Sequence, residues 1–184
     1  MTEEALKRIS KFASKVLRHA PETIGATLDA DGYIPVDDLL AGMASKGMRV
    51  SLDGLIEVVE NNDKRRFGFS EDRTKIRAVQ GHSVRLEGST VTAAIPPAIL
   101  YHGTAEGTVA TILREGLIPQ SRIHVHLSKD VVTAAAVGRR HGRPVVLLVD
   151  AERAAAEGVT FYLAENGVWL CDALPPSYLS LASR

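Results

Sequence analysis

Apolar residues in the first ninety positions follow helical spacing in some segments and strand spacing in others. Near the N-terminus they form one stripe, which predicts an amphipathic helix, at Leu6, Ile9, Phe12, Ala13, Val16 and Leu17. Thr2 is the expected N-cap, and the helix should end before Pro21. Arg18 and His19 therefore fall at its C-terminal end, where exposed carbonyl groups favour cations.

The pattern changes after this helix. A short extended piece contains Pro35, which favours an edge strand. Two helices are expected next, with Asp37 and Ser51 as their N-caps. Segments 66–69 and 75–79 flank a polar turn and predict a hairpin. Helix, strand, two helices and a hairpin is the order of a winged helix, a fold often used on nucleic acids.

The second half predicts a strand-rich unit. A connector is expected at residues 81–97, which are rich in Gly, Ser and Thr and end in a proline pair. We place the boundary near residue 90, so that the domains are residues 1–90 and 91–184. The expected elements are a strand before Gly103, a helix that stops at Gly116, strands at 124–128 and 145–149, a small-residue helix at 134–137 and a hairpin around Asn166-Gly167. The fold class is α+β.

Composition narrows the functional classes. The chain has 184 residues, of which 45% are apolar, enough for a buried core. Its 22 basic residues equal its 22 acidic residues, so a general polyanion-coating surface is not expected. The single cysteine cannot form an internal disulfide, and no apolar run is long enough to span a bilayer. We therefore expect a cytoplasmic protein without a membrane segment.

Arginine is concentrated in three short runs, at residues 15–19, 64–67 and 138–142. Guanidinium groups present a planar fork of donors that fits phosphate oxygens. Arg18 follows an apolar helical stripe, Arg66 precedes two aromatic residues, and Arg140 lies between glycines. These positions suggest a site that grips one phosphate, although an isolated arginine is more often a solvated surface residue.

Histidines offer a second set of candidate groups. His102 precedes Gly103 and Thr104 at the end of an apolar strand, where a ring, an amide and a hydroxyl can surround a nucleotide sugar; a structural hydrogen bond is the alternative. His124 and His126 share a strand face, but no third ligand accompanies them, so no metal is expected. The chain has no Walker loop and no G-x-G-x-x-G after a strand, which argues against ATP and a Rossmann-bound dinucleotide.

Short motifs along nearly the whole chain resemble those of the RNA 2′-phosphotransferase (tRNA 2′-phosphotransferase) family. They are Ser14-Lys15-Val16-Leu17-Arg18-His19, Asp29-Ala30-Asp31-Gly32-Tyr33, Asn62-Asp63-Lys64-Arg65-Arg66-Phe67, Tyr101-His102-Gly103-Thr104, His124-Val125-His126-Leu127-Ser128, Arg140-His141-Gly142 and Asn166-Gly167-Val168-Trp169-Leu170. The resemblance implies an N-terminal winged-helix RNA lobe and a C-terminal NAD-binding lobe of the ADP-ribosyltransferase type, with the active site between them.

The resemblance also implies an NAD-dependent transferase that acts in RNA processing. An internal RNA 2′-phosphate attacks NAD+, which is consumed as a co-substrate, and nicotinamide leaves. The ADP-ribosylated RNA phosphate then breaks down to RNA with a 2′-hydroxyl and ADP-ribose 1″,2″-cyclic phosphate. Where tRNA splicing leaves a 2′-phosphate at the junction, that tRNA is the implied substrate. We expect a monomer.

The family's site residues fall on eight positions of this sequence. The catalytic group is implied to be Arg18, His19, Arg66 and Arg140, and the NAD-binding residues are implied to be His102, Gly103, Thr104 and Ser128. Arg65 and Arg139 stay as alternatives to their neighbours. Arg66 is preferred because it precedes Phe67, and Arg140 because it precedes His141-Gly142. Loss of Arg18 or Arg140 is expected to leave the fold intact, as at a surface position.

Two other classes remain open. An ADP-ribosyltransferase that caps a terminal phosphate of RNA or DNA would leave ADP-ribose on the nucleic acid. A non-catalytic winged-helix RNA-binding protein would not turn over NAD+. Analysis of the products distinguishes all three.

Overall fold

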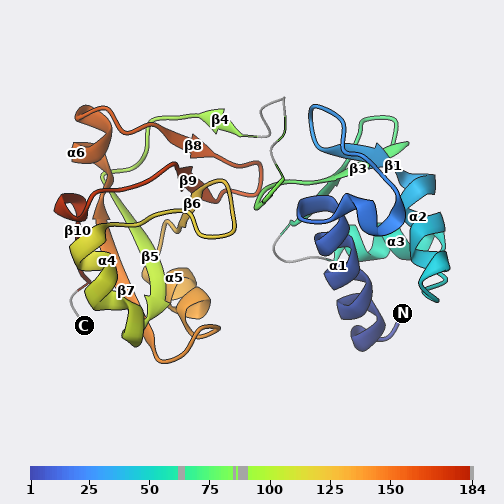
Figure 1. Ribbon diagram of the computed structural model, residues 1–184, viewed down its shortest axis with the longest axis horizontal. Helices are drawn as coiled ribbons and strands as arrows, with labels where there is room; N and C mark the ends of the chain where they lie inside the picture. Colours follow the sequence, from blue (N-terminus) through green and yellow to red (C-terminus); the bar gives the residue numbers. More distant parts are fainter. Residues whose placement is uncertain (62–64, 85, 87–90, 183–184) are drawn as a thin grey trace. The chain divides into compact units, whose positions relative to one another are not determined.

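The computed structural model describes residues 1–61, 65–84, 86 and 91–182. It divides into two compact units, Met1–Thr90 and Val91–Arg184 (Figure 1). Both contain helices and sheets, so the predicted α+β class is confirmed. Residues 62–64, which begin the motif at residues 62–67, and those at the predicted boundary near residue 90 lie outside the described residues. No helix in the described ranges is both long and apolar enough to cross a membrane.

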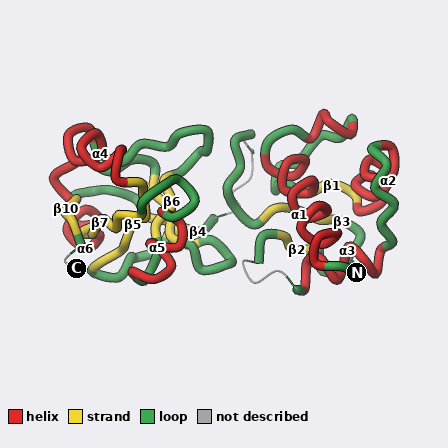
Figure 2. Tube along the Cα trace, turned by 90° about the horizontal axis from the view of Figure 1, so that it is seen from below, coloured by secondary structure: helices red, strands yellow, loops and turns green. Residues whose placement is uncertain are grey.

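The first unit begins with α1 (Glu3–Arg18), as predicted. The amide of Ala5 donates to Oγ1 of the N-cap Thr2 over 3.3 Å. The helix buries its apolar stripe in the core of the unit, and Figure 2 shows it beside α3 and the short strands. His19 is the C-cap and has left the helical conformation. Arg18 is therefore the last helical residue, beside the carbonyl end of the helix.

Three short strands form the sheet of this unit. β1 (Tyr33–Pro35), β2 (Phe67–Phe69) and β3 (Lys75–Ala78) pair antiparallel in the order β1-β3-β2. The edge position of Pro35 and the hairpin are both confirmed. Between β1 and β2 lie α2 (Val36–Ser45) and α3 (Leu52–Glu60), and the 3-10 turn η1 (Pro21–Ile24) follows α1.

The structure confirms one of two predicted helix caps and contradicts the other. The Ser51 cap is confirmed, since its Oγ accepts from the amide of Gly54 over 3.1 Å. The Asp37 cap is wrong. Pro35 is the N-cap of α2, and Asp37 lies inside the first turn, where a carboxylate still interacts favourably with the helix dipole.

The structure also corrects the start of the predicted connector. Gly81 and His82 are buried, and Ser83 hydrogen-bonds to the end of α1, so this segment belongs to the packed part of the first unit. The glycine and polar residues of this segment resemble those of a linker only in composition. Only tertiary contacts, which composition does not contain, reveal the packing.

The second unit contains two small antiparallel sheets. One has the order β10-β7-β5, and the other β4-β8-β9-β6. The strands are β4 (Thr92–Ala93), β5 (Ile99–Ala105), β6 (Val125–Leu127), β7 (Pro144–Asp150), β8 (Phe161–Leu163), β9 (Trp169–Cys171) and β10 (Leu179–Leu181). The predicted hairpin at Asn166-Gly167 is confirmed as β8–β9. A bridge between Tyr101 and Ser128 links β5 to the end of β6.

Helical segments connect the strands of this unit, and α5 (Val131–Gly138) packs on β5 and β7. The other segments are η2 (Glu106–Thr108), α4 (Val109–Glu115), α6 (Ala151–Ala156) and η3 (Pro176–Tyr178). α5 lies along β5 in Figure 1 and packs backbone against backbone. A Cβ on Gly103 would stand 1.7 Å from the carbonyl oxygen of Ala134, and one on Gly138 would stand 2.6 Å from that of Thr104. Glycine at both positions therefore permits this contact.

Candidate functional site

In the first unit, the chain after β3 connects two of the predicted arginines. The amide of Val79 donates to the carbonyl of Arg66 over 2.9 Å, and the amide of Ser83 donates to the carbonyl of Arg18 over 2.9 Å. Val79 and Ser83, four positions apart, thus link the residue before β2 to the last residue of α1. Arg18, His19 and Arg66 each contact segment 79–83, Arg18 and Arg66 through their backbone carbonyls and His19 through the Ser83 side chain.

Arg18 does not occupy the surface position expected for it. Its side chain is only 8% exposed, at the C-terminal end of α1, where a cation is favoured by the helix dipole. The expectation that its loss would leave the fold intact, which rested on a surface location, is therefore corrected. Substitution of Arg18 changes the packing of the first unit as well as its charge.

His82 lies beside these cations, although sequence reasoning missed it. It is 4% exposed, and its pKa is lowered to about 4, first by burial and then by repulsion from Arg18, His19 and Arg77. The charges that act on His82 are thus all positive. Arg77 lies on β3 with its guanidinium carbon 4.8 Å from the ring centre of Tyr33. We call Arg18, His19, Arg77 and His82 the basic cluster.

We expect the stability of the first unit to fall as the pH is lowered from about 6.5 to about 4. Because the folded pKa of His82 is below the unfolded value, protonation in this window favours the unfolded chain. The contribution of neutral His82 to the free energy of unfolding is fully present above pH 6.5 and is lost as the pH falls through 4. At ~1.4 kcal/mol per pKa unit, this contribution amounts to about 3 kcal/mol. Denaturant unfolding followed by far-UV circular dichroism measures it.

The variant His82→Gln supplies the control, because glutamine stays neutral throughout. The difference in unfolding free energy between the wild type and this variant should change across the window, while acidic groups contribute equally to both. NMR titration of the His82 ring should give a midpoint near 4. A midpoint near 6.5 would contradict the argument.

In the second unit, His102 is held in one tautomer. Its Nδ1 lies 3.1 Å from the carbonyl oxygen of His126, and a carbonyl only accepts, so Nδ1 carries the proton. Burial is the main cause that lowers the pKa of His102, which keeps the ring neutral near pH 7. Nε2 is then a hydrogen-bond acceptor. The ring can therefore accept from a hydroxyl group such as that of a ribose.

Gly103 and Thr104 follow on the same strand, with roles that the sequence did not show. Gly103 gives α5 the space to approach β5. The hydroxyl of Thr108 donates to the carbonyl of Ala105 over 2.8 Å, so the hydroxyl of Thr104, 2.7 Å from it, is the donor in their bond. Thr104 is 8% exposed, and its proton is used inside the protein.

Ser128 and Arg140 meet β5 from two sides. Ser128 exchanges backbone hydrogen bonds of 2.8 and 2.9 Å with Tyr101, the neighbour of His102. Arg140 lies in the turn that joins α5 to β7, and the first residue of β7 pairs with the last residue of β5. The four predicted NAD-binding residues and Arg140 are thus gathered around the C-terminal half of β5.

Arg139 and Arg140 are alike in their surroundings. Both are exposed, and within the described ranges neither side chain makes a hydrogen bond or ion pair. Their geometry does not separate the preferred residue from its alternative. An exposed cation without a carboxylate partner is nevertheless suited to meet an anion at no cost in folding energy.

His124 and His126, considered as a metal pair, have other partners. His124 Nε2 lies 3.6 Å from Asp172, and its ring packs on Tyr162. His126 Nδ1 lies 2.8 Å from Nη1 of Arg122, which can only donate. Both histidines are thus part of local networks. Arg122, which the sequence did not single out, orients the ring of His126.

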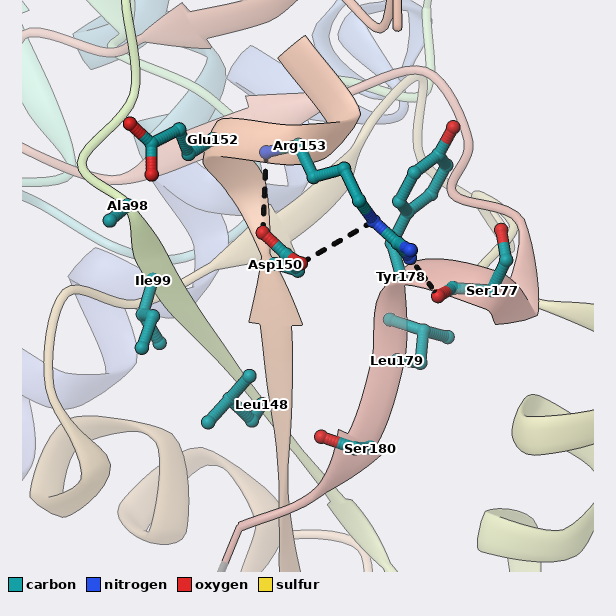
Figure 3. Close-up of a pocket in the computed structure, with 10 residues that line it drawn as sticks. All are labelled: Ala98, Ile99, Leu148, Asp150, Glu152, Arg153, Ser177, Tyr178, Leu179 and Ser180. Atoms are coloured by element: carbon teal, nitrogen blue, oxygen red, sulfur yellow. Dashed lines mark hydrogen bonds and ion pairs between the residues drawn. The ribbon is translucent and has the colours of Figure 1, made fainter. Parts of the chain in front are cut away.

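A separate surface pocket lies at the other end of the β5–β7 ladder (Figure 3). Arg153 is its central side chain. It donates to the carbonyl of Ser177, pairs with Asp150 at 3.4 Å, and places its guanidinium 4.9 Å from the ring centre of Tyr178. These bonds fasten α6 to η3 and β7. The pocket is best explained as a structural corner, away from His102 and Thr104.

Comparison with known proteins gives one consistent result. The family model "RNA 2'-phosphotransferase, Tpt1 / KptA family" matches residues 4–173. A probable RNA 2'-phosphotransferase of Herpetosiphon aurantiacus is 51% identical over 98% of this chain and 99% of its own length. Proteins of the same name from Trichormus variabilis and Agrobacterium fabrum are 52% and 53% identical, each over 95% of this chain and over 95% and 93% of their own lengths. The chain therefore belongs to the RNA 2′-phosphotransferase family.

Proposed function

We propose that this protein uses NAD+ to remove an internal 2′-phosphate from RNA. The first unit would be a winged-helix RNA lobe, which is supported by its element order and the β1-β3-β2 sheet. The second would be an NAD-binding lobe of the ADP-ribosyltransferase type. The observation that carries the proposal is the match to the family, and it is supported by the contacts that Arg18, His19 and Arg66 each make with segment 79–83.

The chemistry has two steps. In the first, an oxygen of the RNA 2′-phosphate attacks the ribose carbon that bears nicotinamide, and nicotinamide leaves with the bonding electrons. In the second, the neighbouring ribose hydroxyl attacks the phosphorus, and the bond to the RNA 2′-oxygen breaks. The hydroxyl proton ends on the leaving oxygen. The products are RNA with a 2′-hydroxyl and ADP-ribose 1″,2″-cyclic phosphate.

Arginines suit both steps, because negative charge stays on one phosphate while its bonds change. We assign Arg18, Arg66 and Arg140 to its oxygens. Arg18 is packed at the end of a helix, so its charge needs little reorganisation as the reaction proceeds. His19 is assigned to proton transfer in the second step, which an imidazole performs well near neutral pH.

The groups around β5 fit a nucleotide. His102 offers Nε2 as an acceptor for a ribose hydroxyl, and its tautomer is fixed by the carbonyl of His126. The hydroxyl of Ser128 makes no hydrogen bond among the described residues, and its backbone is pinned to β5. Gly103 and Thr104 contribute backbone groups rather than a free side chain. We assign these four residues to NAD+.

We expect the purified protein to convert a short 2′-phosphorylated RNA only when NAD+ is present. Mass analysis should find nicotinamide, the 2′-hydroxyl RNA and ADP-ribose cyclic phosphate in equal amounts. RNA without the 2′-phosphate is the control and should release no nicotinamide. ADP-ribose that stays on the RNA would favour a capping transferase, and binding without nicotinamide release would favour an RNA-binding protein.

A further inference from the structure

The segment after β3 brings a serine to the predicted catalytic histidine. Ser83 donates its amide to the carbonyl of Arg18 over 2.9 Å, which fixes its backbone beside the end of α1. Its Oγ then lies 2.9 Å from Nδ1 of His19. Sixty-four positions separate the two residues in sequence, so the contact is a product of the fold. The buried neighbour His82 anchors the segment.

The direction of this hydrogen bond follows from the other contact of the hydroxyl. Ser83 Oγ donates to the carbonyl of Arg18 over 3.5 Å, and a carbonyl can only accept. The single hydroxyl proton is therefore directed at Arg18. The oxygen lone pairs are left for His19, so Nδ1 is the donor to Ser83. In a neutral ring, Nε2 is then the basic nitrogen.

We propose that Ser83 is a positioning residue that holds the ring of His19 with Nδ1 protonated, so that Nε2 is the nitrogen that can accept a proton. This inference rests on the proposed function. In the second step, Nε2 would receive the proton of the attacking ribose hydroxyl and return it to the RNA 2′-oxygen as the phosphorus–oxygen bond breaks. A ring in the other tautomer could not accept that proton at Nε2, as for any histidine base whose second nitrogen lacks its orienting partner.

The experiment compares Ser83→Ala, Ser83→Thr and the control Ser10→Ala in the full chain. Ser10 lies on α1 and belongs to no part of the proposed site. We expect Ser83→Ala to slow breakdown of the ADP-ribosylated RNA about 10- to 100-fold in a single turnover, while nicotinamide release changes less than about threefold. Threonine keeps the hydroxyl, so Ser83→Thr and Ser10→Ala should both stay within about threefold of the wild type.

Nitrogen NMR of the His19 ring reads the tautomer without any turnover. The wild type and Ser83→Thr should show the proton on Nδ1, and Ser83→Ala should shift the ring toward protonated Nε2. An unchanged tautomer in Ser83→Ala, or equal loss of both steps, would overturn the inference. If the wild type released no nicotinamide, the proposed function would fail, whereas the tautomer would still decide whether Ser83 orients His19.

Discussion

Gly103→Ala should destabilise the second unit by at least about 3 kcal/mol. A Cβ at this position would stand 1.7 Å from the carbonyl oxygen of Ala134 and 2.5 Å from its carbonyl carbon. Both atoms belong to the backbone of α5, so the whole helix must move, and overpacking of this kind is among the most costly substitutions. The chain's single tryptophan, Trp169, is buried in this unit, so its fluorescence during denaturant unfolding measures the change.

Gly107→Ala is the matched control for this prediction. Gly107 lies in η2, four residues further along, and a Cβ there would meet nothing within 4 Å. Its unfolding midpoint should stay close to that of the wild type. If Gly103→Ala unfolded at the same denaturant concentration as Gly107→Ala, the close packing of α5 on β5 would be wrong.

The contact between Gly103 and α5 explains why the sequence motif singled out Gly103 although its structural role could not be predicted from the sequence. The motif Tyr101-His102-Gly103-Thr104 marks a candidate nucleotide site, and a glycine there suggests room for a ligand. In the structure, the space beside Gly103 is filled by α5. β5 and the helix α5 that lies along it are distant in sequence, so no local sequence pattern indicates how closely they approach.

Local signals were sufficient for most elements. The stripe and the Thr2 cap defined α1, and the Asn166-Gly167 pair defined a hairpin, because neighbours in sequence make these contacts. Asp37 shows the limit of such signals. Asp37 is a good capping residue by type, but it is the second residue of α2. Pro35, which ends the edge strand β1, is the N-cap and fixes where the helix begins.

In the candidate site, too, local features could be predicted from the sequence and contacts between distant segments could not. Arg18 and His19 could be placed at a helix end from the sequence, but the burial of Arg18 could not, because His82 and Ser83 cover this end from a segment that resembles a linker. The bond between His19 and Ser83 spans 64 positions. Sequence motifs thus indicated the candidate residues, and only the fold showed which residues pack against them.

Arg140→Ala should reduce phosphate removal by about 100- to 1,000-fold without a change in stability. Loss of one donor from a preorganised anion site typically has an effect of this size. The side chain is exposed and bonds to no described residue, so the unfolding free energy should stay within about 0.5 kcal/mol of the wild type. Single-turnover measurement of cyclic phosphate release, together with Trp169 fluorescence, separates the two effects.

Arg139→Ala makes this comparison decisive, because Arg139 is the adjacent residue, is equally exposed and carries the same charge. A general loss of positive charge would slow both variants alike and would be relieved in both by lower salt. A specific phosphate ligand affects one position only. If Arg139→Ala alone lost activity, the ligand would be Arg139; if neither did, the turn between α5 and β7 would take no part in holding the phosphate.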